Sequence, residues 1–215
     1  MSERYPGYDV LNKRNSMSWN DQTRKVIDQR LRLDPDRHLF FSDEEWPTLR
    51  VLCDRIVPQT TVRPHPIPVA AMVDEKMYTN AGDGYRYASL PPMRETWRQG
   101  LAALDAESRD RHSLRFHELE PLQQDAILKA VQDGKVTNRA WRDLPPKSFF
   151  TKRLLHDVVS SYYAHPTSWN EIGFGGPASP RGYVRMNFDR RDPWEASEAR
   201  PGREDRARRE NERVG

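Results

Sequence analysis

The side chains best suited to acid–base or nucleophilic chemistry in this 215-residue chain are six histidines and one cysteine. The histidines are His38, His65, His112, His117, His156 and His165. They form no HExxH zinc motif, and the sequence has no GxSxG nucleophile elbow and no Cys/His nucleophile pattern. One hypothesis for the function of the chain is a stand-alone helical enzyme that uses His156 or His165 with nearby acids. Against this hypothesis, a lone helical histidine is more often structural.

Cys53 is the single cysteine, and this count excludes several redox and metal-binding classes. A single cysteine cannot form an internal disulfide or a CxxC pair. It also cannot supply a CxxCH haem attachment or ligate an iron–sulfur cluster with other cysteines. We interpret Cys53 as a small buried hydrophobic residue of a helix. We therefore expect this chain to hold no cofactor and no metal of its own.

The glycine-rich segment Gly173–Gly176 invites comparison with a nucleotide-binding loop. Such a loop follows a strand and opens a helix whose N-terminus faces the phosphates. Here a predicted helix precedes the glycines, Pro177 and Pro180 interrupt the chain after them, and no Gly-Lys-Ser/Thr is present. We therefore expect a tight loop that folds onto a surface, either the chain's own or a partner's.

Large aromatic and arginine side chains gather in the same irregular part of the sequence. A segment so rich in glycine and proline cannot form a core by itself, so these side chains either pack back on the helices or anchor another protein. For the second alternative, the predicted partner-binding residues are Trp169, Phe174, Arg181, Tyr183, Arg185, Met186, Phe188 and Trp194.

The elements that must position these residues are predicted to be helices joined by long Pro/Gly-rich loops. Asn20 and Ser42 are typical N-caps, and Glu45, three residues after Ser42, completes a capping box. Prolines suited to a first helical turn are Pro68, Pro92, Pro121 and Pro146. No stretch combines apolar/polar alternation with β-branched residues, as a half-buried strand would. The sequence therefore predicts an all-α class, with one irregular helical domain and extended terminal segments.

Two features predict where helices pack tightly. Gly100 lies inside a predicted helix, where glycine costs about 1 kcal/mol relative to alanine, and marks a close approach of another helix. The most apolar predicted helix follows Pro145 and carries paired apolar residues every four or five positions, which gives it a wide buried face. We therefore expect Leu154 and Val158 at the centre of the domain, and an irregular chain from Pro166 onwards.

Charge is mixed along the sequence, with a formal net charge of +3. Residues 181–215 hold ten arginines and eight acids, whereas an arm that binds nucleic acid would be far more one-sided. A nucleic-acid binder with a basic tail is thus the weaker alternative. We divide the chain into an N-terminal extension with a short helix at 1–38, a helical domain at 39–188 and a charged, disordered tail at 189–215.

Neither a membrane span nor an export signal is predicted. The longest run free of charged and strongly polar residues is Pro66–Val73, far shorter than the roughly 20 residues that a spanning helix needs. Residues 1–18 contain no apolar stretch and no twin-arginine pair that would mark an export signal. We expect a cytoplasmic protein, which reaches the periplasm only if a partner with a signal carries it.

Several segments, taken in order, carry a resemblance to a known family. They are residues 40–58, 68–74, 100–105, 116–124, 149–157, 162–166 and 172–183, beginning with Phe-Phe-Ser and ending with the glycine-rich stretch. In this order they resemble the gluconate 2-dehydrogenase subunit 3 family, and the resemblance extends over roughly 39–188.

This resemblance implies an accessory role. In the family, FAD and the hydride chemistry belong to a large subunit of the glucose–methanol–choline type, and electrons leave through a cytochrome or another acceptor. The small subunit is non-catalytic, supports folding and assembly of the large one and, in many members, brings it along for export. This sequence lacks the twin-arginine signal of those exported members, and no family catalytic residue exists to be carried over.

Overall fold

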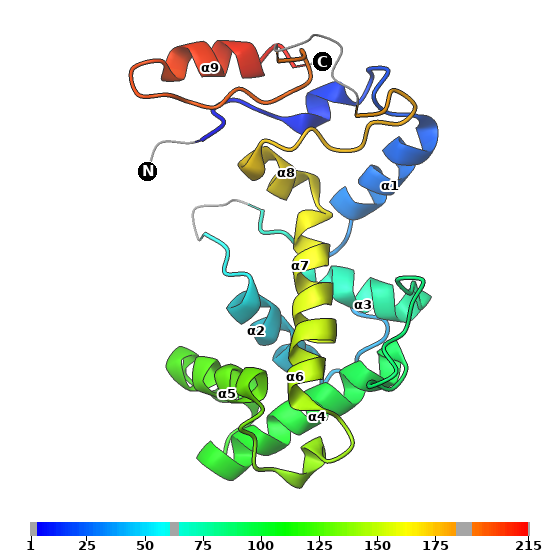
Figure 1. Ribbon diagram of the computed structural model, residues 1–215, viewed down its shortest axis with the longest axis vertical. Helices are drawn as coiled ribbons and strands as arrows, with labels where there is room; N and C mark the ends of the chain where they lie inside the picture. The colour runs from blue at the N-terminus through cyan, green and yellow to red at the C-terminus, as the bar shows by residue number, and fades with distance from the viewer. Residues whose placement is uncertain (1–3, 61–64, 184–190, 215) are drawn as a thin grey trace. The chain divides into compact units, whose positions relative to one another are not determined.

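The computed structural model describes residues 4–60, 65–183 and 191–214, which are predominantly helical (Figure 1). In these ranges the only pairing of extended backbone is an isolated bridge between Trp19 and Ser179, so the predicted all-α class is confirmed. None of the described helices is long and apolar enough to cross a membrane. The chain forms two compact units, which we call unit 1 (residues 1–32 and 163–215) and unit 2 (residues 33–162). These bounds differ from the predicted division at residues 38/39 and 188/189, because the two ends of the chain fold together.

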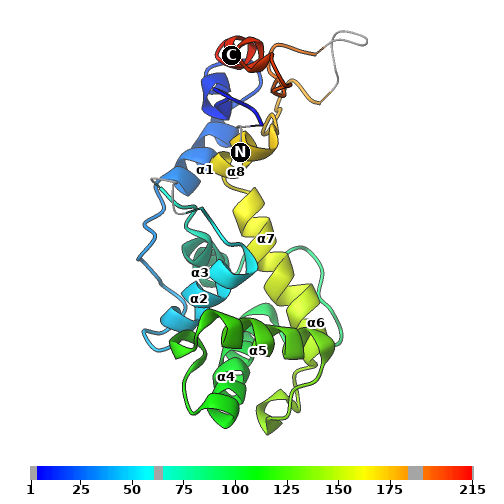
Figure 2. The same ribbon diagram turned by 90° about the vertical axis from the view of Figure 1, so that its left-hand side faces the viewer.

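Unit 2 contains a succession of helices around one apolar core. Its elements are α2 (Trp46–Ile56), α3 (Val69–Thr79), α4 (Met93–His112), η2 (Phe116–Glu118), α5 (Pro121–Asp133), η3 (Arg139–Trp141), α6 (Pro146–Phe149), the π-helical turn η4 (Phe150–Leu154) and α7 (Leu155–Tyr163), whose last residue is counted in unit 1. The consecutive helices α6, η4 and α7 run through the unit, and α2 and α3 pack against each other beside them (Figure 2).

The core of unit 2 confirms the predicted role of its most apolar helix. Leu154 and Val158 are completely buried. Other fully or almost fully buried side chains of this core are Leu49, Leu52, Val73, Met77, Trp97, Leu101, Leu104, Phe116, Ile127 and Phe149. The capping box also forms, because the Ser42 N–H donates to Glu45 Oε2 (2.9 Å) and the Glu45 N–H donates to Ser42 Oγ (3.3 Å).

Unit 1 joins the two ends of the chain. Its elements are η1 (Val10–Lys13), α1 (Asp21–Leu31), α8 (Pro166–Ile172) and α9 (Glu204–Asn211). A small core holds them together and consists of Tyr8, Val10, Trp19, Ile27, Trp169 and Val214. The short helix η1 lies against α8 (Figure 2), where the Val10 N–H donates to Asn170 Oδ1 at 2.8 Å.

The chain after Pro166 is more regular than the sequence predicted. Helix α8 occupies Pro166–Ile172, with Pro166 in its first turn and the His165 side chain accepting the Thr167 N–H at 3.3 Å. The prediction of an irregular chain was therefore wrong for this helix. The proline that ends the preceding helix also opens the next one, because proline is well suited to a first helical turn.

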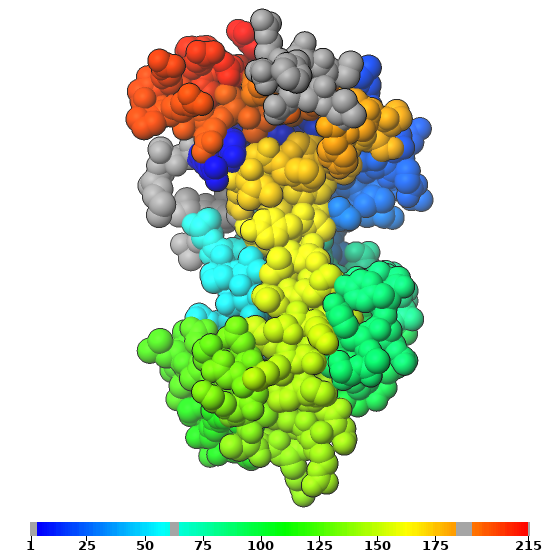
Figure 3. Space-filling model, in the orientation of Figure 1, coloured from blue at the N-terminus to red at the C-terminus, as the bar shows by residue number. Residues whose placement is uncertain are grey.

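Helix α9 lies within the segment predicted as a disordered tail. Ala207 and Asn211 of this helix are buried, and the Asn211 side chain bonds to the backbone of Ser197 and to the Pro6 carbonyl (2.9 Å). Figure 3 shows the red and orange C-terminal segment beside the blue N-terminal residues. These contacts to the other end of the chain order a sequence whose composition alone indicates disorder.

Candidate functional site

Trp169, the first predicted partner-binding residue, belongs to the chain's own core. Its side chain is 3% exposed, and its indole N–H donates to the Tyr163 carbonyl at 2.6 Å. The Phe174 ring meets the Trp169 ring edge to face, with 5.9 Å between ring centroids. For Trp169 the structure therefore matches the alternative in which the aromatic residues pack back on the helices.

Phe174 and Tyr183 are the exposed members of the predicted set, with 41% and 71% of their surfaces accessible. Arg181 and Trp194 come together, since the Arg181 guanidinium carbon lies 3.8 Å from the centroid of the Trp194 ring. The Arg181 Nε also donates to Ser18 Oγ at 3.0 Å. The other three predicted residues, Arg185, Met186 and Phe188, lie outside the described residues.

The glycine-rich loop Gly173–Gly176 folds onto unit 1 itself. A Cβ built on Gly173, which has a φ of +67°, would lie 2.5 Å from the Tyr5 ring, so only glycine allows this approach. The Lys13 ammonium group donates a hydrogen bond to the Gly175 carbonyl, and the Lys13 side chain is fully buried. Burial, with a smaller contribution from the charge of Arg181, lowers the pKa of Lys13 to about 8.

A second polar site surrounds Asp157 in unit 2. This carboxylate is fully buried and accepts hydrogen bonds from Trp97 Nε1 (2.7 Å) and Lys76 Nζ (2.9 Å). Arg153 Nη1 lies 3.2 Å from both carboxylate oxygens. Sequence reasoning singled out the neighbouring His156 and missed Lys76 and Trp97, because nothing in their spacing marks partners so far apart in the chain.

Asp83 links His156 to the same network. Its carboxylate accepts from Lys76 Nζ at 2.6 Å and lies 3.6 Å from His156 Nε2. Burial raises the pKa of Asp83, but the Lys76 hydrogen bond and the charges of Lys76, His156 and Arg153 outweigh it and hold that pKa below its usual value. Asp83 is thus kept ionised at neutral pH rather than poised as a general base.

Asp83, His156 and Asp157 could offer metal ligands, since one atom of each lies within 4.8 Å of the others. However, Lys76 and Arg153 already donate to these carboxylates, and a divalent cation would have to displace both. His165, the other candidate histidine, caps α8. The arrangement therefore fits a neutralised ion network better than a metal centre or an acid–base pair.

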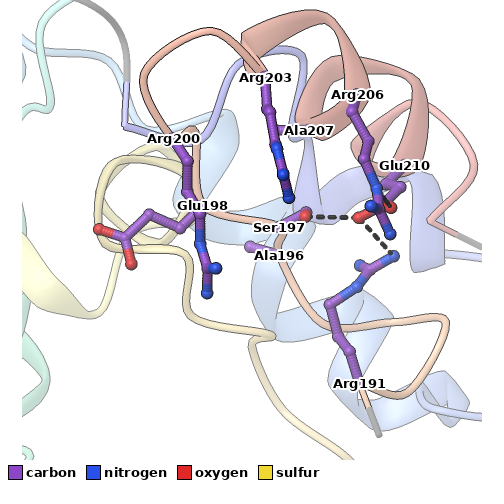
Figure 4. Close-up of a pocket in the computed structure, with 9 residues that line it drawn as sticks. All are labelled: Arg191, Ala196, Ser197, Glu198, Arg200, Arg203, Arg206, Ala207 and Glu210. Atoms are coloured by element: carbon purple, nitrogen blue, oxygen red, sulfur yellow. Dashed lines mark hydrogen bonds and ion pairs between the residues drawn. The ribbon is translucent and has the colours of Figure 1, made fainter.

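Sequence reasoning also missed a polar cavity of about 330 Å³ in unit 1 (Figure 4). It lies between α9 and the segment that precedes this helix, and its lining residues are Arg191, Ala196, Ser197, Glu198, Arg200, Arg203, Arg206, Ala207 and Glu210. The available signal was only the arginine-rich composition of residues 181–215, because Arg200 and Arg203 precede α9 and no helical spacing relates them to Arg206.

Comparison with known proteins gave one match. The family model described as gluconate 2-dehydrogenase subunit 3 matches residues 43–176, which is more than half of the chain. No curated protein and no solved structure matched. The matched range takes in nearly all of unit 2 and reaches the glycine-rich loop, but it ends before the arginine-lined cavity.

Proposed function

Because the chain belongs to the gluconate 2-dehydrogenase subunit 3 family, we propose that it is a non-catalytic small subunit of an oxidoreductase complex. It binds a flavin-dependent alcohol, sugar or sugar-acid dehydrogenase large subunit and supports its folding and assembly. FAD and the hydride chemistry belong to that large subunit, and this chain holds no cofactor. A cytochrome or another electron acceptor is a further partner of the complex.

The observation that carries the docking proposal is the exposed Phe174 ring on a fixed loop. Phe174 contacts the buried Trp169 on one side, and the flanking glycines lie against Tyr5, Val10 and Trp169. An aromatic side chain held in place before binding loses little conformational entropy when it enters a partner's pocket. Tyr183, with the stacked pair Arg181 and Trp194 in the same segment, adds residue types that are enriched in binding hot spots.

The network around Asp157 supports an accessory role over a stand-alone enzyme. A general base needs an accessible group with a pKa near the working pH. Asp157 is fully buried under three donors, and the pKa of Asp83 is lowered rather than raised. Turnover of a sugar acid by the purified chain without a flavoprotein would favour the enzyme alternative instead.

Co-purification tests the proposal. The chain is co-expressed with a flavin-dependent dehydrogenase large subunit of its organism, as the wild type and as the Phe174→Ala/Tyr183→Ala double variant. We expect the double variant to retain at least tenfold less large subunit, since the loss of a single anchor worth about 2 kcal/mol already weakens binding about thirtyfold. The melting temperature of the lone chain should fall only slightly, because both side chains are substantially exposed.

The matched control is Tyr78→Ala/Leu122→Ala, which removes side chains of 54% and 83% exposure from unit 2. This control should bind the large subunit as the wild type does. A large drop in melting temperature for the Phe174→Ala/Tyr183→Ala chain with binding intact would assign these rings to the core and overturn their docking role.

A further inference from the structure

We propose that unit 1 carries a binding site for a small polyanion, a molecule with two or more carboxylate or phosphate groups, in the cavity beside α9. Four arginines and two glutamates line this cavity, so its wall carries an excess of positive charge. Its volume of about 330 Å³ is at the lower end of the range of ligand-binding pockets, roughly 300–1,000 Å³. This proposal does not rest on the proposed interaction with a dehydrogenase large subunit.

Two of the arginines are already paired. Glu210 accepts hydrogen bonds from Arg206 Nε (2.9 Å) and Ser197 Oγ (2.6 Å), and Arg191 Nη2 lies 3.7 Å away. These contacts, with the Ser197 hydrogen bond the largest, hold the pKa of Glu210 below its usual value. Glu210 therefore stays ionised and fixes one side of the cavity.

The other two arginines, Arg200 and Arg203, are not paired with any acid among the residues that the structure describes. Within the described part of the chain, the guanidinium groups of Arg200 and Arg203 form no hydrogen bond and no ion pair with a carboxylate. Glu198, the other acid of the cavity, bonds to Arg4 Nε at 2.8 Å. Figure 4 shows the Arg200 and Arg203 side chains extending over the stretch that holds Ala196 and Ser197.

The backbone that carries these arginines is held in place by side-chain contacts. Asn211, fully buried, accepts from the Ser197 N–H (2.6 Å) and donates to the Ser197 carbonyl (3.0 Å) and the Pro6 carbonyl. The Ala199 N–H donates to the Arg4 carbonyl at 2.8 Å. The two free guanidinium groups thus extend from a segment tied at several points, as a binding site requires.

The chemistry of the free groups defines the ligand class. A guanidinium group presents a fixed fork of donors that matches the paired oxygens of a carboxylate or a phosphate. Two such forks in one cavity favour a ligand with two or more anionic groups over a single anion. Once the first anionic group of such a ligand is bound, its second anionic group is held near the other arginine at a high effective concentration, which increases the overall affinity.

The experiment measures binding to the full chain by titration calorimetry at low ionic strength. Its three probes are inorganic phosphate, pyrophosphate and citrate. We expect pyrophosphate or citrate to bind and phosphate to bind more weakly. In the Arg200→Gln/Arg203→Gln variant the affinity for the bound probe should fall about tenfold or more, the loss expected for charge-assisted bidentate contacts. Binding of citrate but not pyrophosphate would define the ligand as a carboxylate, and the reverse would define it as a phosphate.

The matched control is Arg208→Gln/Arg209→Gln, which removes the same charge from exposed positions of α9 outside the cavity. We expect this control to keep the wild-type affinity within about twofold. An equal loss in both double variants would mean diffuse electrostatic attraction, and no binding of any probe at about 1 mM would leave the cavity without a ligand. Either result overturns the proposal.

Discussion

Gly100 of α4 lies directly against the ring of Phe149, which ends α6: a Cβ built on Gly100 would stand 2.2 Å from Phe149 Cε2. The close packing predicted for this glycine is therefore present, and the partner is a fully buried aromatic ring. We expect Gly100→Ala to lower the free energy of unfolding by about 1–3 kcal/mol, the usual cost of overpacking, although alanine is the better helix former. Urea denaturation measures the change.

The control for this substitution is Gly82→Ala. A Cβ at Gly82 meets nothing within 4 Å, and Gly82 has no left-handed backbone conformation. The free energy of unfolding should therefore stay within about 0.5 kcal/mol of the wild type. A Gly100→Ala chain as stable as the wild type would show that the ring can move aside at no cost, and that the two helices are not tightly packed.

Leu154→Ala tests the centre of unit 2. Leu154 is completely buried, so its truncation leaves a cavity and should lower the free energy of unfolding by about 2–5 kcal/mol. The adjacent Leu155 is 38% exposed, and Leu155→Ala should cost clearly less. Thermal and urea unfolding of the two variants would contradict this assignment if their losses were equal.

Local signals in the sequence predicted local structure well. Asn20 caps α1, because its Oδ1 accepts the Thr23 N–H at 2.9 Å, and Ser42 and Glu45 form their capping box before α2 begins at Trp46. Each of these motifs involves residues only three positions apart, so the pattern of side chains defines the interaction completely. Pro121, which the sequence marked as suited to a first helical turn, is the first residue of α5.

Features that depend on distant residues could not be predicted in this way. Helix α9 is fixed by the Asn211 contact to Pro6, at the other end of the chain. The partners of Asp157 include Trp97 and Lys76, which lie on two other helices. Composition and periodicity carry no information about such pairings. The sequence therefore indicated a disordered tail where the structure has a helix, and it did not reveal the partners of Asp157.

Asp157→Asn should destabilise unit 2 strongly. The substitution keeps an acceptor for the Trp97 indole but removes the negative charge that Lys76 and Arg153 share. Leaving buried cations undercompensated costs about 3–5 kcal/mol, which urea denaturation would detect. Asp143→Asn, at an exposed position, should change the free energy of unfolding by less than about 0.5 kcal/mol. Equal stability of the two variants would show that the Asp157 network contributes little.

Lys13 should make the stability of the chain rise with pH in the alkaline range. Its pKa is lowered from 10.5 to about 8 by burial, so between these values the unfolded chain binds a proton that the folded chain does not. Stability increases with pH wherever the unfolded state binds more protons. The cost of burying the charged lysine is therefore fully present below about pH 8 and is progressively relieved as the pH rises towards 10.5.

Lys13→Met isolates this contribution, because methionine keeps the apolar stem and cannot titrate. Urea unfolding of both chains at about pH 7.5 and about pH 9.5 should show the wild type gaining about 1–2 kcal/mol relative to the variant. Subtracting the free energy of unfolding of the variant from that of the wild type cancels the contributions of the titrating groups that both chains have. The fully buried Lys13 donates to the Gly175 carbonyl, so the variant also tests whether that contact is needed to hold the glycine-rich loop. Parallel pH profiles for the two chains would mean that Lys13 titrates in the folded state as it does in water.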